Sequence, residues 1–315
     1  MEFLFLILGL VALIIGGDTL VKGAVSIALK AKISPLVVGM TVVSFGTSAP
    51  ELLVSLNAAL SSHPDVSIGA VVGSNISNLG LVLGITVLVF PILVNRDSIR
   101  IDWPIMMIAT VLFFLFAKNG EIEFWEGVVF VLILALFTTW LVVRSRKKGI
   151  ALAAEEEVEE LGSKNPIGKD LAYIAVGMLG LYFGAEWLID SVVSIAQSYG
   201  VSEKLISVTV VAFGTSVPEL VTSCVAALKK ETDISIGNLI GSNLFNILAI
   251  LGITAIVHPI KVADSINEFD VYYLLGISLL ILPFMLHQKR IGRGKGFFLV
   301  ISYLIYIYFS ISGEI

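Results

Sequence analysis

Two glutamates stand inside long apolar stretches of the chain, each at the end of the same short motif. Glu51 ends Gly-Thr-Ser-Ala-Pro-Glu, and Glu219 ends Gly-Thr-Ser-Val-Pro-Glu. An ionisable side chain in an apolar segment of membrane length is costly, and it usually faces a partner or a water-filled cavity. A buried acid satisfied by Ser or Thr hydroxyls is the plain structural alternative. Because both acids have the same surroundings, we expect the pair to line a shared cation site.

The residues around each glutamate could supply neutral oxygen ligands. Pro50 and Pro218 have no amide hydrogen, and a proline clashes with the preceding turn of a helix. We therefore expect each helix to break here and to free backbone carbonyls, which are tolerated at membrane depth where they line a cavity. The carbonyl candidates are Ser44, Thr47, Ala212 and Thr215, and the hydroxyl candidates are Thr47, Ser48, Thr215 and Ser216.

Two further segments, Gly-Ser-Asn-Ile-Ser-Asn and Gly-Ser-Asn-Leu-Phe-Asn, add hydroxyl and amide oxygens. Their candidates are Ser74, Asn75, Asn78, Ser242, Asn243 and Asn246. Hydrogen bonding between helices is the alternative role, above all for Asn75 and Asn243. Carboxylates combined with flexible neutral oxygens suit hard cations, and Ca²⁺ accepts roughly six to eight such ligands in irregular geometry. The residue types therefore favour Ca²⁺ and Na⁺ over softer metals, which prefer Cys and His.

The elements that hold these residues are membrane-spanning helices. The chain has 315 residues, of which 57% are hydrophobic and only 14% are charged, too little polar surface for a soluble globule. We expect the first apolar stretch to be a helix rather than a removable signal peptide, because no basic segment precedes it. The expected spans are 3–22, 35–60, 67–90, 103–117, 124–143, 171–190, 205–228, 234–258, 271–287 and 297–312.

The chain contains an internal duplication. Residues 41–60 align without gaps to 209–228, an offset of 168, with 14 of 20 positions identical. The same offset pairs 67–86 with 235–254, with 11 of 20 positions identical. Each copy holds five expected spans, so an odd number of crossings inverts the second copy in the membrane. Inverted repeats are typical of secondary transporters, which bind their substrate near the midplane where the repeats meet.

These observations predict an all-α membrane protein with ten transmembrane helices in two inverted five-helix repeats, in which helices 2 and 7 are broken. Residues 1–143 form the first repeat, 144–170 a polar linker, and 171–315 the second repeat. Alternating ten spans places 17 of the 20 basic residues on the side of the linker. That side is therefore expected to be cytoplasmic, with both termini extracellular.

The paired motifs resemble the two alpha-repeats of the sodium/calcium exchanger family, within the cation/Ca²⁺ antiporter superfamily. The resemblance rests on GTSAPE with GSNISN in one half and GTSVPE with GSNLFN in the other. It extends to the ten-span inverted layout and covers nearly the whole chain. It implies exchange of Ca²⁺ for Na⁺ by alternating access in a prokaryotic plasma membrane, with helices one and six sliding across a rigid core and with no cofactor.

The resemblance also implies a role for each motif residue. Glu51 and Glu219 would be the central Ca²⁺ ligands, joined by the carbonyls of Thr47 and Thr215, with Asn78 and Asn246 completing the cluster. The flanking Na⁺ sites would use Ser44, Thr47, Ser48, Glu51 and Ser74 on one side, and Ala212, Thr215, Ser216, Glu219 and Ser242 on the other. Some archaeal and potassium-dependent relatives have an aspartate at the last asparagine, whereas this chain has asparagine in both halves, so its core carries two carboxylates.

Several other functions are compatible with parts of the pattern. A proton/Ca²⁺ antiporter would keep the fold and change the driving ion. A channel would need a continuous pore, which one central site between inverted repeats does not favour. An intramembrane enzyme would need a catalytic signature such as H-E-x-x-H or G-x-S-x-G, and the sequence contains neither. We therefore expect a non-enzymatic antiporter, functional as a monomer in the lipid bilayer, with Ca²⁺, Na⁺ or H⁺ as its partners and no nucleic acid.

Overall fold

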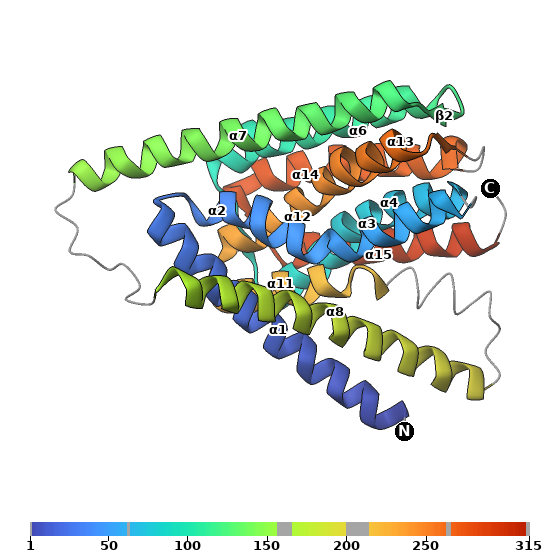
Figure 1. Cartoon of the computed structure of the whole chain (residues 1–315), viewed down its shortest axis with the longest axis horizontal. Coiled ribbons are helices and arrows are strands. Elements are labelled where there is room, and N and C mark those ends of the chain that lie inside the picture. Colours follow the sequence, from blue (N-terminus) through green and yellow to red (C-terminus); the bar gives the residue numbers. More distant parts are fainter. Residues whose placement is uncertain (1, 62–63, 156–165, 200–213, 263–265, 313–315) are drawn as a thin grey trace.

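The computed structural model describes residues 2–61, 64–155, 166–199, 214–262 and 266–312. Long helices run side by side, and α1 and α8 lie together along one side of the bundle (Figure 1). The helices of the first half are α1 (Glu2–Ala31), α2 (Pro35–Val38), η1 (Gly39–Val43), α3 (Ser44–Leu60), α4 (Pro64–Ser77), η2 (Asn78–Val82), α5 (Leu83–Val89), η3 (Ser98–Asp102), α6 (Trp103–Ala117) and α7 (Phe124–Glu155). Those of the second half are α8 (Ile167–Ser198), α11 (Val217–Leu228), α12 (Thr232–Phe245), η5 (Asn246–Leu251), α13 (Gly252–Val257), η6 (Ile266–Asp270), α14 (Val271–Leu286), η7 (His287–Lys289) and α15 (Arg293–Ser312).

The predicted all-α membrane architecture is confirmed. Within the described ranges, eight helical segments are long and apolar enough to cross a bilayer, and they coincide with eight of the expected spans. The expected span 297–312 lies in α15, and the described part of the expected span 205–228 contains α11. Both ends of the linker are helical, because α7 continues to Glu155 and α8 begins at Ile167.

The duplication recurs in the backbone. Short π-helical segments begin at Asn78 and Asn246, and two others begin at Ser98 and Ile266. Each pair is separated by the repeat offset of 168 residues. A π-turn adds a residue to one helical turn and often occurs at a functional site. The two halves therefore share local backbone geometry as well as sequence.

Four two-residue strands join the halves at opposite ends of the bundle. Strand β1 (Ile92–Leu93) pairs antiparallel with β4 (Arg290–Ile291), and β2 (Glu121–Ile122) pairs antiparallel with β3 (Ile260–Lys261). Each sheet thus takes one strand from the first half and one from the second. The pairing of strands follows the same inverted symmetry as the helices.

The third and eighth spans form the centre of the molecule. In the most apolar 18-residue stretch of Ser67–Val89, 83% of the residues are buried inside the protein; the share is 78% for Thr232–Val257 and only 17% for Phe124–Gly149. The first two spans carry the Gly-Ser-Asn segments. Their side chains are therefore placed at the interface of the two halves, and the span formed by α7 has a mostly peripheral surface.

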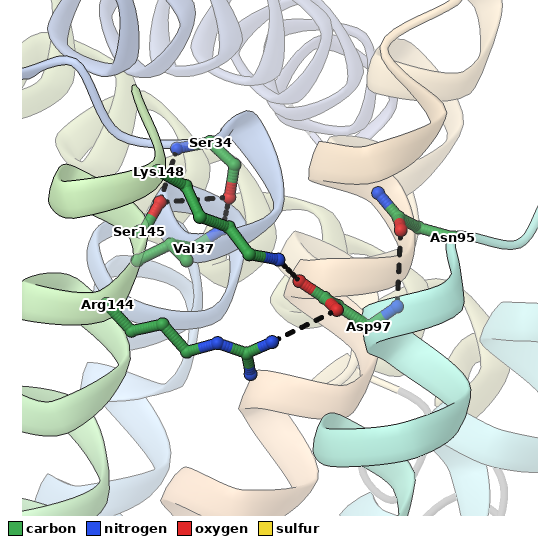
Figure 2. Close-up of polar contacts among 7 residues, drawn as sticks. All are labelled: Ser34, Val37, Asn95, Asp97, Arg144, Ser145 and Lys148. Atoms are coloured by element: carbon green, nitrogen blue, oxygen red, sulfur yellow. Dashed lines mark hydrogen bonds and ion pairs between the residues drawn. The ribbon is translucent and has the colours of Figure 1, made fainter. Parts of the chain in front are cut away.

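Helix α7 is fastened to its neighbours at the end that leads into the linker (Figure 2). Ser145 Oγ accepts a 2.8 Å hydrogen bond from the backbone N–H of Ser34, which precedes α2. Asp97, just before η3, accepts hydrogen bonds from Arg144 at 3.4 Å and Lys148 at 2.7 Å. The bond to Ser34 fixes the start of the second span, which carries Glu51, against α7, and the contacts of Asp97 fix the start of the fourth span.

Helices α1 and α8 approach each other through glycines. A Cβ atom added to Gly16 would lie 2.7 Å from the backbone nitrogen of Leu181, and one added to Gly177 would lie 2.6 Å from that of Leu20. Small residues allow such backbone contact between membrane helices. The first and sixth spans are therefore packed as one unit.

Candidate ion-binding site

Glu51 and Glu219 come from equivalent places in the two halves and lie deep in the protein. Glu51 belongs to α3 and is 2% exposed, and Glu219 lies in the first turn of α11 and is fully buried. The two glutamates are close enough for the charge of Glu219 to act on Glu51. Ser48, one helical turn before Glu51, donates a 2.8 Å hydrogen bond from Oγ to Glu219 Oε1. The structure thus brings the two predicted acids into one site.

The candidate residues of the first motif share one face of α3. Ser44, Thr47, Ser48 and Glu51 are spaced at i, i+3, i+4 and i+7, which places their side chains along a single helical face. All four are buried. The second motif repeats this spacing in Thr215, Ser216 and Glu219, while its remaining member, Ala212, lies outside the described residues.

The two motifs differ in how their helices are interrupted. In the second half, Thr215 and Ser216 form a turn directly before α11, with Pro218 near the helix start, where a missing N–H costs no helical bond. In the first half, the chain stays helical through Pro50, and the departure from α geometry lies earlier, at Gly39–Val43. Pro50 removes the helical hydrogen bond to the carbonyl four residues before it, which belongs to Gly46. Pro50 therefore frees the carbonyl of Gly46, a backbone oxygen that the sequence reasoning did not name.

The Gly-Ser-Asn segments bring their side chains to the same region. Ser74, Asn78, Ser242 and Asn246 are each at most 2% exposed. Asn78 and Asn246 are the first residues of the π-helical segments η2 and η5. Ser74 Oγ lies 3.3 Å from Thr215 Oγ1, so a hydroxyl of the first half meets the motif of the second. The structure thus places the predicted oxygens of both Gly-Ser-Asn segments at the contact between the halves.

Many oxygens of this region have no hydrogen-bond partner within the described part of the chain. They include one carboxylate oxygen of each glutamate and the side-chain oxygens of Asn78, Ser216, Ser242 and Asn246. Buried polar atoms are almost always paired in folded proteins, and an exception calls for a water or an ion. The donor set consists of hard oxygens, which fits Na⁺ or Ca²⁺ as a transported substrate.

Asn75 and Asn243, for which interhelical hydrogen bonding was the alternative, differ in their contacts. Asn243 Nδ2 donates to the carbonyl of Leu239 in its own helix at 2.8 Å, and its Oδ1 has no partner among the described residues. Both polar atoms of Asn75 are unpaired in the same part of the chain. Neither residue makes a side-chain hydrogen bond to another helix in the described structure, so that alternative role is not seen for them there.

A buried amide beside the site was not predicted. Asn238 of α12 is fully buried and contacts both Thr47 and Ser44 of α3. The sequence does hold a signal for it, because the equivalent position in the first half is Ala70, so the repeat is broken by a polar residue.

Asp18 and Glu186 occupy equivalent positions but have different environments. Asp18 pairs with Lys22 at 2.6 Å, as its helical spacing predicts. It also pairs with Lys229 of α11 at 2.5 Å, which joins α1 to the helix that carries Glu219. Glu186 lies on the exposed surface of α8. These residues belong to the periphery, and the described chain holds no group of three or more Asp, Glu, His or Cys side chains able to bind a metal.

Comparison with known proteins agrees with this geometry. The family model described as "Sodium/calcium exchanger protein" matches residues 1–143 and 169–312. The sodium/calcium exchanger MaX1 of Methanosarcina acetivorans is 32% identical over 345 residues, which cover 97% of this chain and 97% of that protein. The inner membrane protein YrbG of Escherichia coli is 32% identical over 307 residues, covering 96% of this chain and 94% of that protein.

Solved structures show the same likeness. The sodium-calcium exchanger NCX_Mj, soaked with Na⁺ and Ca²⁺, superimposes with a TM-score of 0.83 at 30% sequence identity, covering 98% of this chain and 97% of that one. Its structure without Na⁺ and Ca²⁺ gives a TM-score of 0.84. With its two inverted halves and paired acidic motifs, the chain belongs to the sodium/calcium exchanger family of the cation/Ca²⁺ antiporter superfamily.

Proposed function

We propose that this cation/Ca²⁺ antiporter exchanges Ca²⁺ for Na⁺ across a prokaryotic plasma membrane by alternating access. The observation that carries the proposal is the buried pair of Glu51 and Glu219, together with buried oxygens that have no hydrogen-bond partner among the described residues. Two carboxylates supply a charge of −2, which one Ca²⁺ neutralises. The names of MaX1 and NCX_Mj, which describe sodium/calcium exchangers, support the choice of ions.

In this proposal, Ca²⁺ binds between the two glutamates, and Na⁺ binds in flanking positions. The central ligands are Glu51, Glu219, Asn78, Asn246 and the carbonyls of Thr47 and Thr215. The flanking ligands of the first half are Ser44, Thr47, Ser48 and Ser74, and those of the second half are Ala212, Thr215, Ser216 and Ser242. The bond from Ser48 to Glu219 and the contact of Ser74 with Thr215 support a site shared by both halves.

We assign the moving part to α1 and α8. These two helices contact each other through backbone atoms. Their contacts with the core involve side chains: a Cβ at Gly17 would lie 3.1 Å from the Val221 side chain, and one at Gly46 would meet the Met178 side chain. Side chains can rearrange where backbones cannot, so the pair can shift against α3 and α11 as one body. Such a shift would open the site to one side of the membrane at a time.

The topology that fits this proposal has both termini outside and the linker in the cytoplasm. The N-terminal end of α1 lies at the opposite end of the bundle from the start of α8 (Figure 1). Residues 1–143 and 171–315 would act as the inverted halves and 144–170 as the linker. Because one chain supplies both halves of the site, a monomer suffices for transport.

The test is uptake of radioactive Ca²⁺ into proteoliposomes that contain the purified protein. An outward Na⁺ gradient should drive uptake, and an outward proton gradient at equal Na⁺ should not. Uptake driven by the proton gradient alone would identify a proton/Ca²⁺ antiporter and overturn the assignment of Na⁺. Proteoliposomes with Glu51→Gln provide the baseline for passive leak, because this change removes a central charge and keeps the side-chain volume.

A further inference from the structure

Asn238 links three helices at the edge of the ion site. Its Oδ1 lies 3.3 Å from Thr47 Oγ1 of α3, and its Nδ2 donates a 3.1 Å hydrogen bond to Ser223 Oγ of α11. Its backbone carbonyl accepts a 3.1 Å hydrogen bond from Ser44 Oγ. Asn238 is fully buried, so these contacts are shielded from water.

These contacts determine how the Thr47 hydroxyl is oriented. Because Nδ2 of Asn238 is committed to Ser223, the atom facing Thr47 is Oδ1, which can only accept. The carbonyl of Ser44, at 3.3 Å, and the carboxylate of Glu219 also lie within reach of Thr47 Oγ1, and both are acceptors. A hydroxyl has one hydrogen and two lone pairs. Thr47 therefore donates its hydrogen to protein acceptors and keeps its oxygen lone pairs available to a cation.

Thr215, the counterpart of Thr47 in the second half, has different surroundings. Subtracting the repeat offset of 168 from 238 gives Ala70, whose side chain has no polar atom. Thr215, the counterpart of Thr47, has its Oγ1 3.3 Å from Ser74 Oγ, and either hydroxyl can be the donor. One threonine thus faces a fixed amide acceptor, while the other faces a hydroxyl that can turn.

We propose that Asn238 is a positioning residue, which holds the Thr47 oxygen toward Na⁺ in the first-half flank of the site. Because the first half has Ala70 at the matching position, Thr215 has no equivalent amide, and the two flanks bind Na⁺ with unequal affinity. This inference rests on the proposed Na⁺/Ca²⁺ exchange. It adds a role for Asn238, which is not itself an ion ligand. It also predicts that the two flanking Na⁺ sites differ, although the repeat relates them by symmetry.

The experiment measures Ca²⁺ release from loaded proteoliposomes as a function of external Na⁺. Asn238→Ala should raise the half-saturating Na⁺ concentration by about three- to tenfold, the range expected for one buried hydrogen bond, with a smaller change in maximal rate. Ser235→Ala is the matched control. Its Oγ donates a 3.0 Å hydrogen bond to the Ser223 carbonyl, and it is buried in the same helix, but no hydrogen bond joins it to Thr47 within the described structure. It should retain the wild-type Na⁺ dependence.

A double-mutant cycle separates positioning from a general structural role. Thr47→Val removes the hydroxyl and should raise the half-saturating Na⁺ concentration by itself. Adding Asn238→Ala to Thr47→Val should then change this concentration by less than about twofold, because the shared interaction is already lost. Fully additive effects would overturn the inference. If Asn238→Ala does not fold, Asn238→Ser takes its place. This variant keeps a polar atom at the position, but its single hydroxyl cannot reproduce both amide contacts.

The outcomes distinguish the two proposals. Wild-type protein that releases no Ca²⁺ on addition of Na⁺ overturns the proposed exchange and this inference together. Wild-type protein that responds to Na⁺, with an Asn238→Ala variant of unchanged Na⁺ dependence, overturns only the role of Asn238. A shift in Asn238→Ala that is matched by Ser235→Ala also overturns it, because the effect would then come from the buried hydroxyl network rather than from Thr47.

Discussion

Ser48 Oγ donates its hydrogen bond to Glu219 Oε1, so a hydroxyl of the first half holds the acid of the second. The acid of the second repeat is therefore not held by its own motif alone. Disturbing one motif should affect ion binding across the whole site.

Replacing either glutamate should nearly abolish Ca²⁺ transport. Glu51→Gln and Glu219→Gln each remove half of the formal charge of the site while keeping the shape of the side chain. We expect normal membrane insertion, measured by yield and size-exclusion profile, and uptake of Ca²⁺ near the level of empty liposomes. The control is Glu126→Gln, which changes an acid at the start of α7 that accepts a bond from the Glu123 N–H. Ca²⁺ uptake retained in either site variant would rule out the central role.

Ser48→Ala should weaken Ca²⁺ binding without abolishing it. A hydrogen bond to a charged group contributes about 1.5–3 kcal/mol, so the apparent Ca²⁺ affinity should fall roughly tenfold or more. Isothermal titration of the purified protein measures this change. Ser55→Ala removes another buried hydroxyl of α3, which contacts Ser67 at 2.7 Å, and should leave the affinity unchanged. Equal losses in both variants would show that the effect is not specific to Glu219.

Acidic pH should inhibit exchange. The two carboxylates share one buried site, so protons compete there with Na⁺ and Ca²⁺ for the same oxygens. Stimulation of Ca²⁺ uptake by the Na⁺ gradient should fall as the pH is lowered from neutral to about 5, a range over which carboxyl groups that share a buried site take up protons. Raising the Ca²⁺ concentration should restore part of the rate. A flat pH profile over this range would show that protons do not reach the site.

Breaking the ion pair between Asp18 and Lys229 should alter the speed of transport but not ion affinity. The pair joins α1 to α11 at 2.5 Å, and both side chains are about one-third exposed. Partly exposed pairs contribute about 0–1 kcal/mol, so Lys229→Met should raise the maximal rate by at most about fivefold. Lys22→Met is the control, since it leaves the Asp18–Lys229 contact in place. A shifted half-saturating Ca²⁺ concentration in Lys229→Met would place Lys229 nearer to the ions than we infer.

Gly16→Ala should destabilise the protein. The added methyl group would lie 2.7 Å from the Leu181 nitrogen, so the α1 and α8 backbones would have to separate. Overpacking of this kind costs about 1–3 kcal/mol, which a thermal unfolding measurement in detergent detects as a lowered midpoint. Gly276→Ala in α14, where an added Cβ meets no atom within 4 Å, should keep the wild-type midpoint. If both variants melt alike, the backbone contact of α1 with α8 is not close.

The sequence predicted the architecture because its signals are long and repeated. Apolar stretches of membrane length identify helices, and the constant offset of 168 residues relates Glu51 to Glu219 without knowledge of the fold. The GSN segments were likewise expected at the interface of the halves, and the structure buries Ser74 and Ser242 there. These features depend on residue type and spacing alone.

The remaining features depend on tertiary contacts. Whether a helix shifts from α to π geometry at Asn78 is determined by packing, because the sequence can form either hydrogen-bond pattern. Two-residue strands are too short to show a periodic pattern. The contact between Asn238 and Thr47 joins residues 191 positions apart, and no local motif predicts it.

The paired strands β1–β4 and β2–β3 have a mechanical consequence. We call each strand pair a clasp, because it joins one strand of the first half to one strand of the second. The two clasps hold the halves in register in addition to the covalent linker. Neither α1 nor α8 contributes a strand to them in the described structure. The clasps thus define a frame around the candidate ion site, and α1 and α8, the pair to which we assign the movement, lie outside this frame.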